Sequence, residues 1–298
     1  MQMCDKNVLL NKISEIRRKE PWLIAEALKN RKRRPLFSGK DTIFIIACDH
    51  PARGLLRVGN NSEAMADRVD LLCRAMLALS HPGVDGILAT ADIIEDLAVL
   101  GALDNKLAFG SMNRGGLSGS TYEHDDRFTG YSAQAIYENG LDGGKMLLRL
   151  SLEDPATVRT LESCSKSINE LAAYKLPAII EVLPPTNSKN PTHDLTVAVS
   201  VASGLGITSA YTWLKLPLVE NMDKVIKATT LPIVLLGGDP RENEQEIYPL
   251  WQRALRYPHV FGIVAGRTLL YPQDGNIENA IARAVDILEE KDVRIHED

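Results

Sequence analysis

The chain has 298 residues, 45% of them hydrophobic and 24% charged, and its 34 basic against 39 acidic residues give a formal net charge of −5. This composition is that of an ordinary globular protein with a large core, which excludes collagen, long disorder and disulfide-rich scaffolds. No apolar run approaches the ~20 residues of a membrane span, no secretory signal is recognisable, and the four cysteines form no CxxC pair. We therefore expect a cytoplasmic protein with reduced thiols that binds neither membranes nor nucleic acid.

The first 40 residues are predicted to be helical. Apolar residues such as Leu9, Ile13 and Leu28 recur at helical spacing, interleaved with a basic run over residues 17–34. Such a run can bind RNA or a membrane, but it is more often the solvated face of a helix packed on a neighbour. We expect residues 1–40 to form a helical extension that caps the N-terminal mouth of the domain formed by residues 41–298.

From residue 41 onward, short runs rich in Ile, Val and Leu alternate with longer helical patterns, as in parallel α/β proteins. The predicted strands are residues 42–47, 84–89, 107–112, 145–150, 178–183, 210–214, 233–236 and 261–265. The predicted helices are residues 62–80, 132–139, 155–175, 194–204, 221–229, 244–257 and 277–290.

Eight strand–helix units over ~250 residues predict an α/β fold, a closed (β/α)8 TIM barrel. The competing fold is a doubly wound open sheet with a nucleotide-binding loop. No GxGxxG follows the first predicted strand and no GxxxxGK[ST] occurs, which favours the barrel. Since no linker rich in Pro, Gly or Ser interrupts residues 41–298, we expect them to form a single domain.

Ionisable residues lie inside or directly after the apolar strands. Lys145, Glu181 and Lys215 lie in the fourth, fifth and sixth strand regions, and Asp49 follows the first strand. One such residue can be a strand-end ion pair, but inward side chains of barrel strands converge on a single volume. The four residues therefore predict a catalytic cluster of two ammonium groups and two carboxylates.

A lysine attacks a carbonyl only when it is neutral, so its pKa of about 10.4 has to fall. Desolvation and a second ammonium group both lower that pKa. Lys215 has the most apolar sequence neighbours and is the predicted Schiff-base nucleophile. Glu181 is the predicted principal acid/base with Asp49 assisting, and Lys145 is predicted to tune the nucleophile and contact the substrate.

The last two strand ends predict a phosphate site. Gly237-Gly238 and Gly266-Arg267 follow consecutive strands, glycine lets backbone N–H groups approach a phosphate, and arginine adds a charge-assisted contact. A plain turn explains one Gly-Gly pair equally well. His50 is a candidate substrate donor or a turn cap, and Arg114 is a candidate carboxylate or phosphate clamp or a solvated loop residue.

No metal or cofactor is expected, because the six histidines show no HxH or HxxxH spacing that would hold zinc. This pattern favours a lysine-dependent aldolase over a metal-dependent one. The polar, aromatic segment 122–131 is long enough to act as a lid or a subunit contact.

The pattern resembles class I aldolases of the deoxyribose-phosphate aldolase and tagatose-bisphosphate aldolase superfamily over most of residues 41–290. The motifs that carry the resemblance are Ala-Cys-Asp49, Gly-Gly-Lys145, Ile-Glu181, Leu-Lys215, Gly-Gly-Asp-Pro and Gly-Arg267. The resemblance implies a Schiff base on Lys215, proton transfer by Glu181, matching roles for Asp49 and Lys145, no metal, and a homo-oligomer. It also implies a lyase that cleaves a phosphorylated ketose or keto-sugar acid.

His50, the Pro-Pro pair after Glu181 and the glycine-rich loop at Arg114 differ from the sugar-bisphosphate enzymes. The chain is most similar to a deoxyribose-phosphate aldolase-like branch associated with inositol catabolism. That branch implies cleavage of 2-deoxy-5-keto-gluconate 6-phosphate to dihydroxyacetone phosphate and malonate semialdehyde, with Arg114 or Arg149 on the carboxylate. The alternatives are an aldolase for another phosphosugar (tagatose or fructose bisphosphate, sulfofructose phosphate or deoxyribose phosphate), an isomerase or Schiff-base dehydratase, and a non-catalytic phosphosugar-binding barrel.

Overall fold

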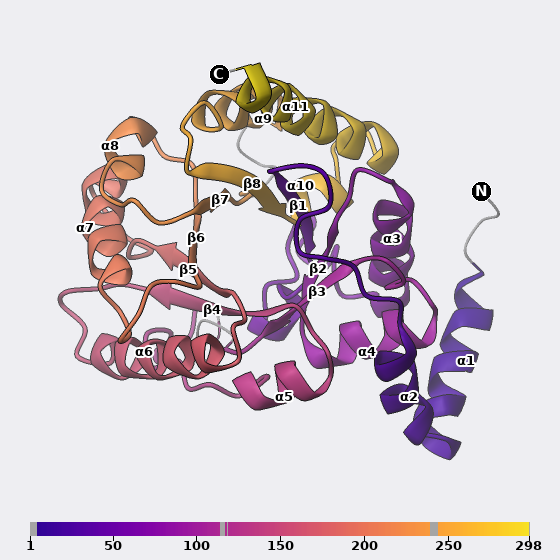
Figure 1. Cartoon of the computed structure of the whole chain (residues 1–298). Helices are drawn as coiled ribbons and strands as arrows, with labels where there is room; N and C mark the ends of the chain where they lie inside the picture. Colours follow the sequence, from indigo (N-terminus) through magenta and orange to yellow (C-terminus); the bar gives the residue numbers. More distant parts are fainter. Residues whose placement is uncertain (1–4, 114–116, 118, 239–243, 298) are drawn as a thin grey trace.

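The structure, a computed structural model, describes residues 5–113, 117, 119–238 and 244–297. Eight parallel strands close into a barrel in the order β1-β2-β3-β4-β5-β6-β7-β8, with helices outside them (Figure 1). The strands are β1 (Ile43–Ala47), β2 (Gly86–Ala89), β3 (Leu107–Ser111), β4 (Gly143–Arg149), β5 (Ala178–Leu183), β6 (Thr212–Leu216), β7 (Ile233–Leu235) and β8 (Val260–Ala265). The predicted (β/α)8 TIM barrel is confirmed.

The described helices follow the strands and cover the outside of the barrel. They are α1 (Lys6–Lys19), α2 (Trp22–Asn30), the 3-10 turn η1 (Pro51–Arg53), α3 (Arg68–Ser80), α4 (Ala91–Val99), α5 (Ala133–Glu138), α6 (Thr157–Ala173), α7 (Pro191–Ser203), α8 (Met222–Ile226), α9 (Glu244–Ala254), α10 (Arg267–Leu270) and α11 (Ile277–Glu297). Helix α3 begins later than residue 62 because Asp67 is its N-cap, accepting a hydrogen bond from the backbone N–H of Asp70. Helices α4 and α10 are not among the predicted helices.

Strand β6 lies two residues later than predicted, since residues 209–212 form a turn in which the Thr212 N–H donates to the Ser209 carbonyl. Side chains two residues apart on a strand share a face, and Trp213 belongs to the interior cluster. Lys215 therefore faces inward, and it pairs in register with Glu181 of β5.

The apolar core has two parts. A large cluster lies between the strands and the helices, and a smaller one fills the barrel interior. In the interior, the Trp213 ring centroid lies 5.0 Å from that of Phe261 and 6.0 Å from that of Phe109. Phe37, on the segment before β1, packs 6.0 Å from Phe261 and 6.3 Å from Trp213. These four rings, here called the aromatic plug, fill the N-terminal end of the barrel.

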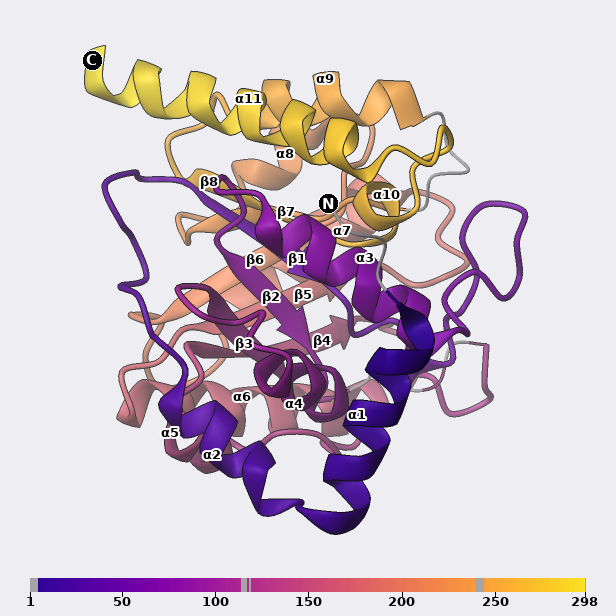
Figure 2. The same cartoon turned by 90° about the vertical axis from the view of Figure 1, so that its right-hand side faces the viewer.

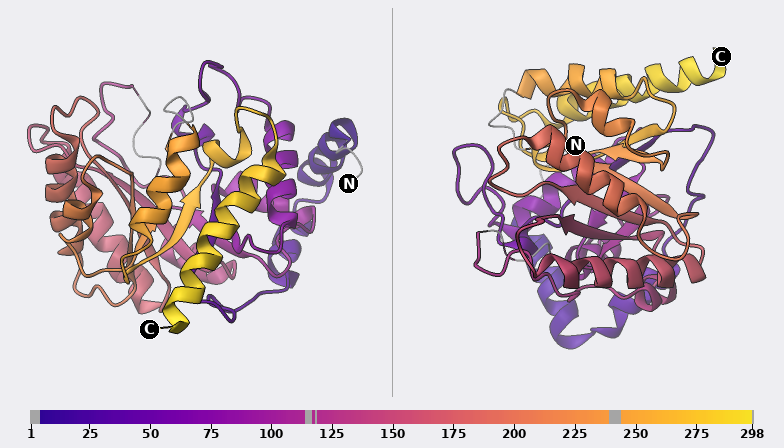
Figure 3. Two further views of the ribbon diagram at one scale, coloured as in Figure 1. Left: turned by 90° about the horizontal axis from the view of Figure 1, so that it is seen from above. Right: turned by 90° about the vertical axis from the view of Figure 1, so that its left-hand side faces the viewer.

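The N-terminal helices lie outside the ring of barrel helices (Figures 2 and 3). Helix α1 packs on α3, and α2 packs on α4. The chain between α2 and β1 then runs along the end of the barrel at which the strands begin, where Leu36 packs on the interior cluster. It is this segment, rather than the two helices, that reaches the N-terminal mouth.

Much of the basic run is paired with acidic residues of the barrel domain. Arg17 donates to Asp96 and forms an ion pair with Glu95. Arg31 and Arg33 both lie 2.9 Å from the carboxylate of Asp142. Paired in this way, these cations attach the extension to the barrel.

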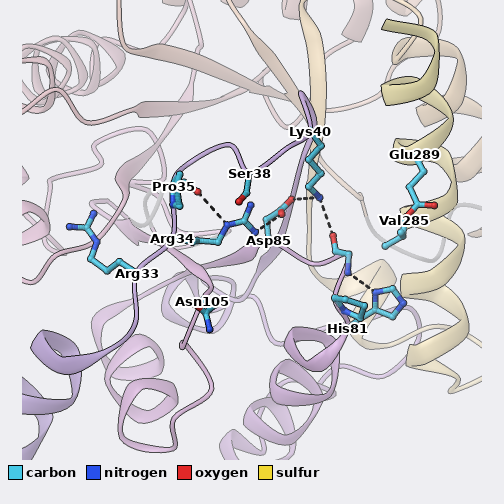
Figure 4. Close-up of a pocket in the computed structure, with 12 residues that line it drawn as sticks. Arg33, Arg34, Pro35, Ser38, Lys40, His81, Asp85, Asn105, Val285 and Glu289 are labelled. Carbon is cyan, nitrogen blue, oxygen red and sulfur yellow. Dashed lines mark hydrogen bonds and ion pairs between the residues drawn. The ribbon is translucent and has the colours of Figure 1, made fainter. Parts of the chain in front are cut away.

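Two buried carboxylates at the N-terminal ends of the strands organise this attachment. Asp85 accepts from the Phe44 N–H at 2.7 Å and pairs with Arg34 at 2.7 Å and Lys40 at 2.9 Å (Figure 4). Asp142 plays the same part further round the barrel, where it accepts from the Ala108 N–H at 2.8 Å. Each carboxylate thus links a strand backbone to the basic segment.

Within the described part of the chain, no helix is long and apolar enough to cross a membrane. Cys48 and Cys164 are buried free thiols. Cys73 is disulfide-bonded, which differs from the expectation that all four cysteines are reduced.

Candidate active site

The four predicted catalytic residues converge inside the barrel. Side chains of a strand alternate between its two faces, and Ile179 and Trp213 belong to the interior cluster. Glu181 and Lys215 lie two residues further along the same strands and therefore also face inward. Lys145 of β4 and Asp49, just after β1, complete the group, and all four side chains are at most 7% exposed.

These residues form one chain of ion pairs, here called the lysine–carboxylate cluster. The Nζ atom of Lys145 lies 2.7 Å from Oδ2 of Asp49 and 2.6 Å from Oε2 of Glu181. The Nζ atom of Lys215 lies 3.2 Å from the same Oε2 of Glu181. Lys145 is thus held by two carboxylates and Lys215 by one.

Because Lys145 has two carboxylate partners and Lys215 has one, the pKa values of the two lysines are shifted in opposite directions. Burial lowers the pKa of both. For Lys145, the charges of Asp49 and Glu181 outweigh burial, and its pKa is raised above the ordinary value. For Lys215, burial together with the Lys145 ammonium outweighs the attraction of Glu181 and Asp49, so its pKa is lowered. The arrangement stabilises the ammonium at position 145 and shifts Lys215 toward the neutral amine.

Both acids are held ionised. Burial raises the pKa of Glu181, but Lys145 and Lys215 outweigh it and bring that pKa well below the ordinary range. Burial likewise raises the pKa of Asp49, and Lys145, Lys215 and His50 outweigh it, so the net direction is downward. Both carboxylates can therefore accept a proton from a bound molecule.

Two polar residues that the sequence analysis missed support the cluster. The Ser111 hydroxyl lies 3.4 Å from Oδ2 of Asp49 and donates to the Asn113 carbonyl at 3.1 Å. The Asn113 side chain accepts from the Leu147 N–H at 2.6 Å and donates to the Leu147 carbonyl at 2.8 Å. Because Ser111 pairs in register with Lys145, its inward position followed from the alternation along β3.

A cavity of about 180 Å³ opens onto Lys215 and Glu181 at the C-terminal ends of the strands. The predicted substrate-binding residues that line it are His50, Gly237, Gly238, Gly266 and Arg267. Arg114 lies outside the described residues, as do the Asp and Pro that follow Gly238. Arg149 and Arg53 also line the cavity, which therefore has three guanidinium groups around it.

Glycine is required at the ends of the last two strands for different structural reasons. Gly238 has a φ of +70°, a conformation that favours glycine. At Gly266, a Cβ atom would lie 2.1 Å from the Ala47 carbonyl oxygen, so this glycine allows β8 to approach β1. The Thr268 hydroxyl donates to the Gly237 carbonyl at 2.8 Å, which fixes the turn after β7.

His50 is a neutral imidazole at the edge of the cavity. Burial, which outweighs the attraction of Asp49, lowers its pKa to about 3. Its buried Nδ1 atom makes no hydrogen bond to any described residue. A neutral imidazole next to the cluster can donate to or accept from a bound molecule without adding charge.

Among the described residues, no group of three or more His, Cys, Asp or Glu side chains is arranged to hold a metal ion. The side chains that line the cavity offer one amine, one carboxylate, three guanidinium groups and an imidazole.

Fold and site together define a (β/α)8 barrel with a lysine–carboxylate cluster buried at its C-terminal mouth. The sequence matches the Cgl0159-like family over residues 41–285, and the chain belongs to that family. The crystal structure of Cgl0159 from Corynebacterium glutamicum is 44% identical, has a TM-score of 0.90, and aligns over 95% of this chain and 97% of that one. None of the curated proteins compared with the sequence matches it.

More distant barrels share the fold. An archaeal fructose 1,6-bisphosphate aldolase is 17% identical over 90% of this chain and 99% of its own, with a TM-score of 0.64. The fructose-bisphosphate aldolase of Slackia heliotrinireducens is 14% identical over 92% of this chain and 91% of its own, with a TM-score of 0.62. At this level of sequence identity, the similarity shows that these proteins share the barrel fold and nothing more specific.

Proposed function

We propose that the protein is a metal-independent class I aldolase, a lyase that forms a Schiff base between Lys215 and a ketone. The observation that carries the proposal is the unequal pairing of the two buried lysines. Lys145 lies between two carboxylates, whereas Lys215 has one contact at 3.2 Å and a lowered pKa. A buried amine with a lowered pKa, beside an ionised carboxylate and open to a cavity, is suited to attack a carbonyl.

In the proposed reaction, neutral Lys215 attacks the carbonyl carbon of the substrate, and the carbonyl oxygen takes up a proton. The resulting carbinolamine loses water to form a protonated imine. Glu181, 3.2 Å from the lysine nitrogen, is the group that moves these protons, with Asp49 as its partner through Lys145.

Cleavage follows from the imine. Glu181 removes the proton from the hydroxyl on the carbon two positions from the imine carbon, and that C–OH becomes an aldehyde C=O. The bond between this carbon and the carbon next to the imine carbon breaks, and its electron pair forms the C=C bond of a neutral enamine as the imine π electrons move onto the nitrogen. A proton then adds to the enamine carbon, and water hydrolyses the imine to release the ketone and free Lys215.

The proposed substrate is a phosphorylated ketose or keto-sugar acid. Arg267 with Gly237, Gly238 and Gly266 lines the cavity on the side of β7 and β8, where barrels of this kind often hold phosphate. The sequence resemblance suggests 2-deoxy-5-keto-gluconate 6-phosphate, cleaved to dihydroxyacetone phosphate and malonate semialdehyde. Several solved barrels of the same fold act on fructose 1,6-bisphosphate, and one is described as Schiff-base forming.

Borohydride trapping with dihydroxyacetone phosphate, followed by peptide mass mapping, tests the proposal. A reduced adduct on Lys215, absent from Lys215→Met, is the expected result. An adduct on Lys145 would exchange the roles of the two lysines. Full cleavage activity in a folded Lys215→Met variant would contradict Schiff-base catalysis at this position. Product analysis separates an aldolase from an isomerase or dehydratase, because only the aldolase releases two carbon fragments.

A further inference from the structure

We propose that Arg53 binds a second anionic group of the substrate, carried by the fragment that leaves as the aldehyde; this proposal rests on the proposed aldolase function. Arg53 is the last residue of η1, directly after β1, and it lines the same cavity as Lys215 and Glu181.

The Arg53 side chain is buried and lacks a partner. It is 6% exposed, and among the described residues it makes no side-chain hydrogen bond or ion pair; its Nε atom is fully enclosed without an acceptor. A buried guanidinium that is left unpaired is unfavourable, whereas a carboxylate or phosphate can take two of its N–H groups at once. An anionic ligand in the cavity supplies the missing acceptor.

The other two cavity arginines already have partners. The Nε of Arg149 lies 3.3 Å from Glu123 and its Nη1 donates to the Pro184 carbonyl at 3.0 Å. Arg267 donates to the Arg57 carbonyl at 3.4 Å and stands beside Gly266, on the side proposed for the phosphate. The Nε atoms of all three lack a hydrogen bond, but of the three only Arg53 makes neither a side-chain hydrogen bond nor an ion pair with any described residue.

The charge of Arg53 also acts on the reacting groups of the lysine–carboxylate cluster. The pKa of Glu181 is affected most by burial and by the two lysines, and the next charge in order of effect is Arg53, which lowers this pKa. Arg53 also lowers the pKa of Lys145, while the pKa of His50 is lowered by both Arg267 and Arg53. A substrate with its phosphate at Arg267 and its carbonyl at Lys215 would extend its remaining carbons toward Arg53.

The test is aldol synthesis from dihydroxyacetone phosphate and three acceptor aldehydes. Malonate semialdehyde carries a carboxylate, glyceraldehyde 3-phosphate carries a phosphate, and glyceraldehyde is neutral. Arg53→Met is expected to lower kcat/KM for at least one anionic acceptor roughly 10- to 100-fold, the effect of losing a charged hydrogen bond. The rate with glyceraldehyde is expected to change by less than ~3-fold. The acceptor that suffers the larger loss identifies the anion as carboxylate or phosphate.

Arg53→Lys, which keeps the charge, is expected to recover part of the loss. Arg57→Met removes an exposed charge from the same loop and serves as the matched control, with no acceptor-dependent change expected. Equal losses with all three aldehydes would overturn the proposal, because Arg53 would then act through Glu181 or Lys145. An unchanged rate with both anionic acceptors would overturn it as well.

Thermal unfolding provides a readout that is independent of catalysis. Since Arg53→Met removes an unpaired buried charge, its Tm without ligand is expected to equal or exceed that of the parent protein. The rise in Tm caused by malonate or inorganic phosphate in the parent is expected to shrink in this variant. A lower Tm without ligand and an unchanged anion effect would identify Arg53 as a structural residue. If borohydride trapping fails in the parent protein while this anion effect depends on Arg53, the aldolase assignment fails and the anion site stands.

Discussion

Lys145 and Lys215 share a single carboxylate oxygen, Oε2 of Glu181, which lies 2.6 Å from one Nζ atom and 3.2 Å from the other. The shorter contact belongs to the lysine that also binds Asp49. The two amines therefore compete for one acceptor, and the less tightly held of the two is the one that opens onto the cavity. This unequal sharing contributes to the raised pKa of Lys145 and, together with burial, to the lowered pKa of Lys215.

The shared oxygen predicts that Lys145 controls the pH dependence of Lys215. Besides burial, the Lys145 ammonium lowers the pKa of Lys215. In the double variant Lys145→Met/Asp49→Asn, that repulsion is gone and Glu181 attracts Lys215 alone, so the pKa of Lys215 is expected to rise. The rate of borohydride trapping, which requires the neutral amine, should then reach half its maximum at a higher pH. Replacing Asp49 as well avoids leaving its charge buried and unpaired. A profile that stays in place or moves to lower pH would contradict the shared-acceptor account.

Glu181→Gln is expected to slow cleavage by roughly 10²- to 10⁴-fold, because an amide cannot accept the hydroxyl proton. Steady-state turnover and single-turnover release of aldehyde measure the effect. Glu153→Gln, an exposed residue in the loop after β4, is the matched control and should retain parental turnover. If Glu181→Gln also turned over normally, Asp49 would be the next candidate for the acid/base role.

Arg267→Met is expected to raise KM for the phosphorylated ketone roughly 10- to 100-fold, the usual effect of losing a charged hydrogen bond to an anion. The change in kcat should be much smaller, because Arg267 is placed at the phosphate rather than at the reacting carbons. Initial rates over a range of dihydroxyacetone phosphate concentrations separate the two parameters. A fall in kcat at unchanged KM would place the phosphate elsewhere.

The cluster also predicts a loss of stability in acid. The folded-state pKa values of Asp49 and Glu181 are lowered, so their ionised forms add stability above the ordinary carboxyl range, and this is lost as the pH falls through and below about 4. Urea unfolding at pH 6 and pH 4 should show a larger fall in the free energy of unfolding for the parent protein than for Lys145→Met/Asp49→Asn/Glu181→Gln. Equal falls would indicate that other carboxylates dominate the acid response.

Asp142→Ala is expected to destabilise the protein by roughly 3–5 kcal/mol, the typical result of removing one member of a buried ion pair. The substitution leaves the buried Arg31 and the Ala108 N–H without this acceptor. Urea unfolding measures the change, and Glu26→Ala, an exposed position on α2, is the matched control. A loss below about 1 kcal/mol would indicate that the basic segment attaches mainly through its apolar contacts.

Much of the barrel fold could be predicted from the sequence, because buried parallel strands appear in it as continuous apolar runs. All eight strands were predicted, although the strand predicted for β6 ended one residue before Lys215. Ionisable residues inside such runs also indicated the cluster, since few other positions in a barrel require them. Alternation along a strand carries no information on distance, so the sharing of Glu181 by two lysines was not foreseen.

The residues that were missed act through contacts that sequence spacing does not encode. Arg53 follows the first strand as an ordinary turn residue, and its burial without a partner depends on the packing of η1. Asn113 bridges to Leu147 across two strands that are distant in the sequence. The acidic partners of the basic run are likewise far away in the sequence. From the sequence alone Arg31 and Arg33 resemble exposed surface charges, whereas in the fold both pair with Asp142.

The aromatic plug of Phe37, Phe109, Trp213 and Phe261 has a kinetic consequence. Because these rings fill the N-terminal end of the barrel, the cavity at Lys215 opens at the C-terminal mouth, so in the proposed reaction we expect both cleavage products to leave on the side by which the substrate enters. In the proposed Schiff-base reaction the ketone stays bonded to Lys215 until its imine is hydrolysed, so we expect the aldehyde to depart first and the ketone to follow. Reversal imposes the opposite sequence, with the ketone bound before the aldehyde.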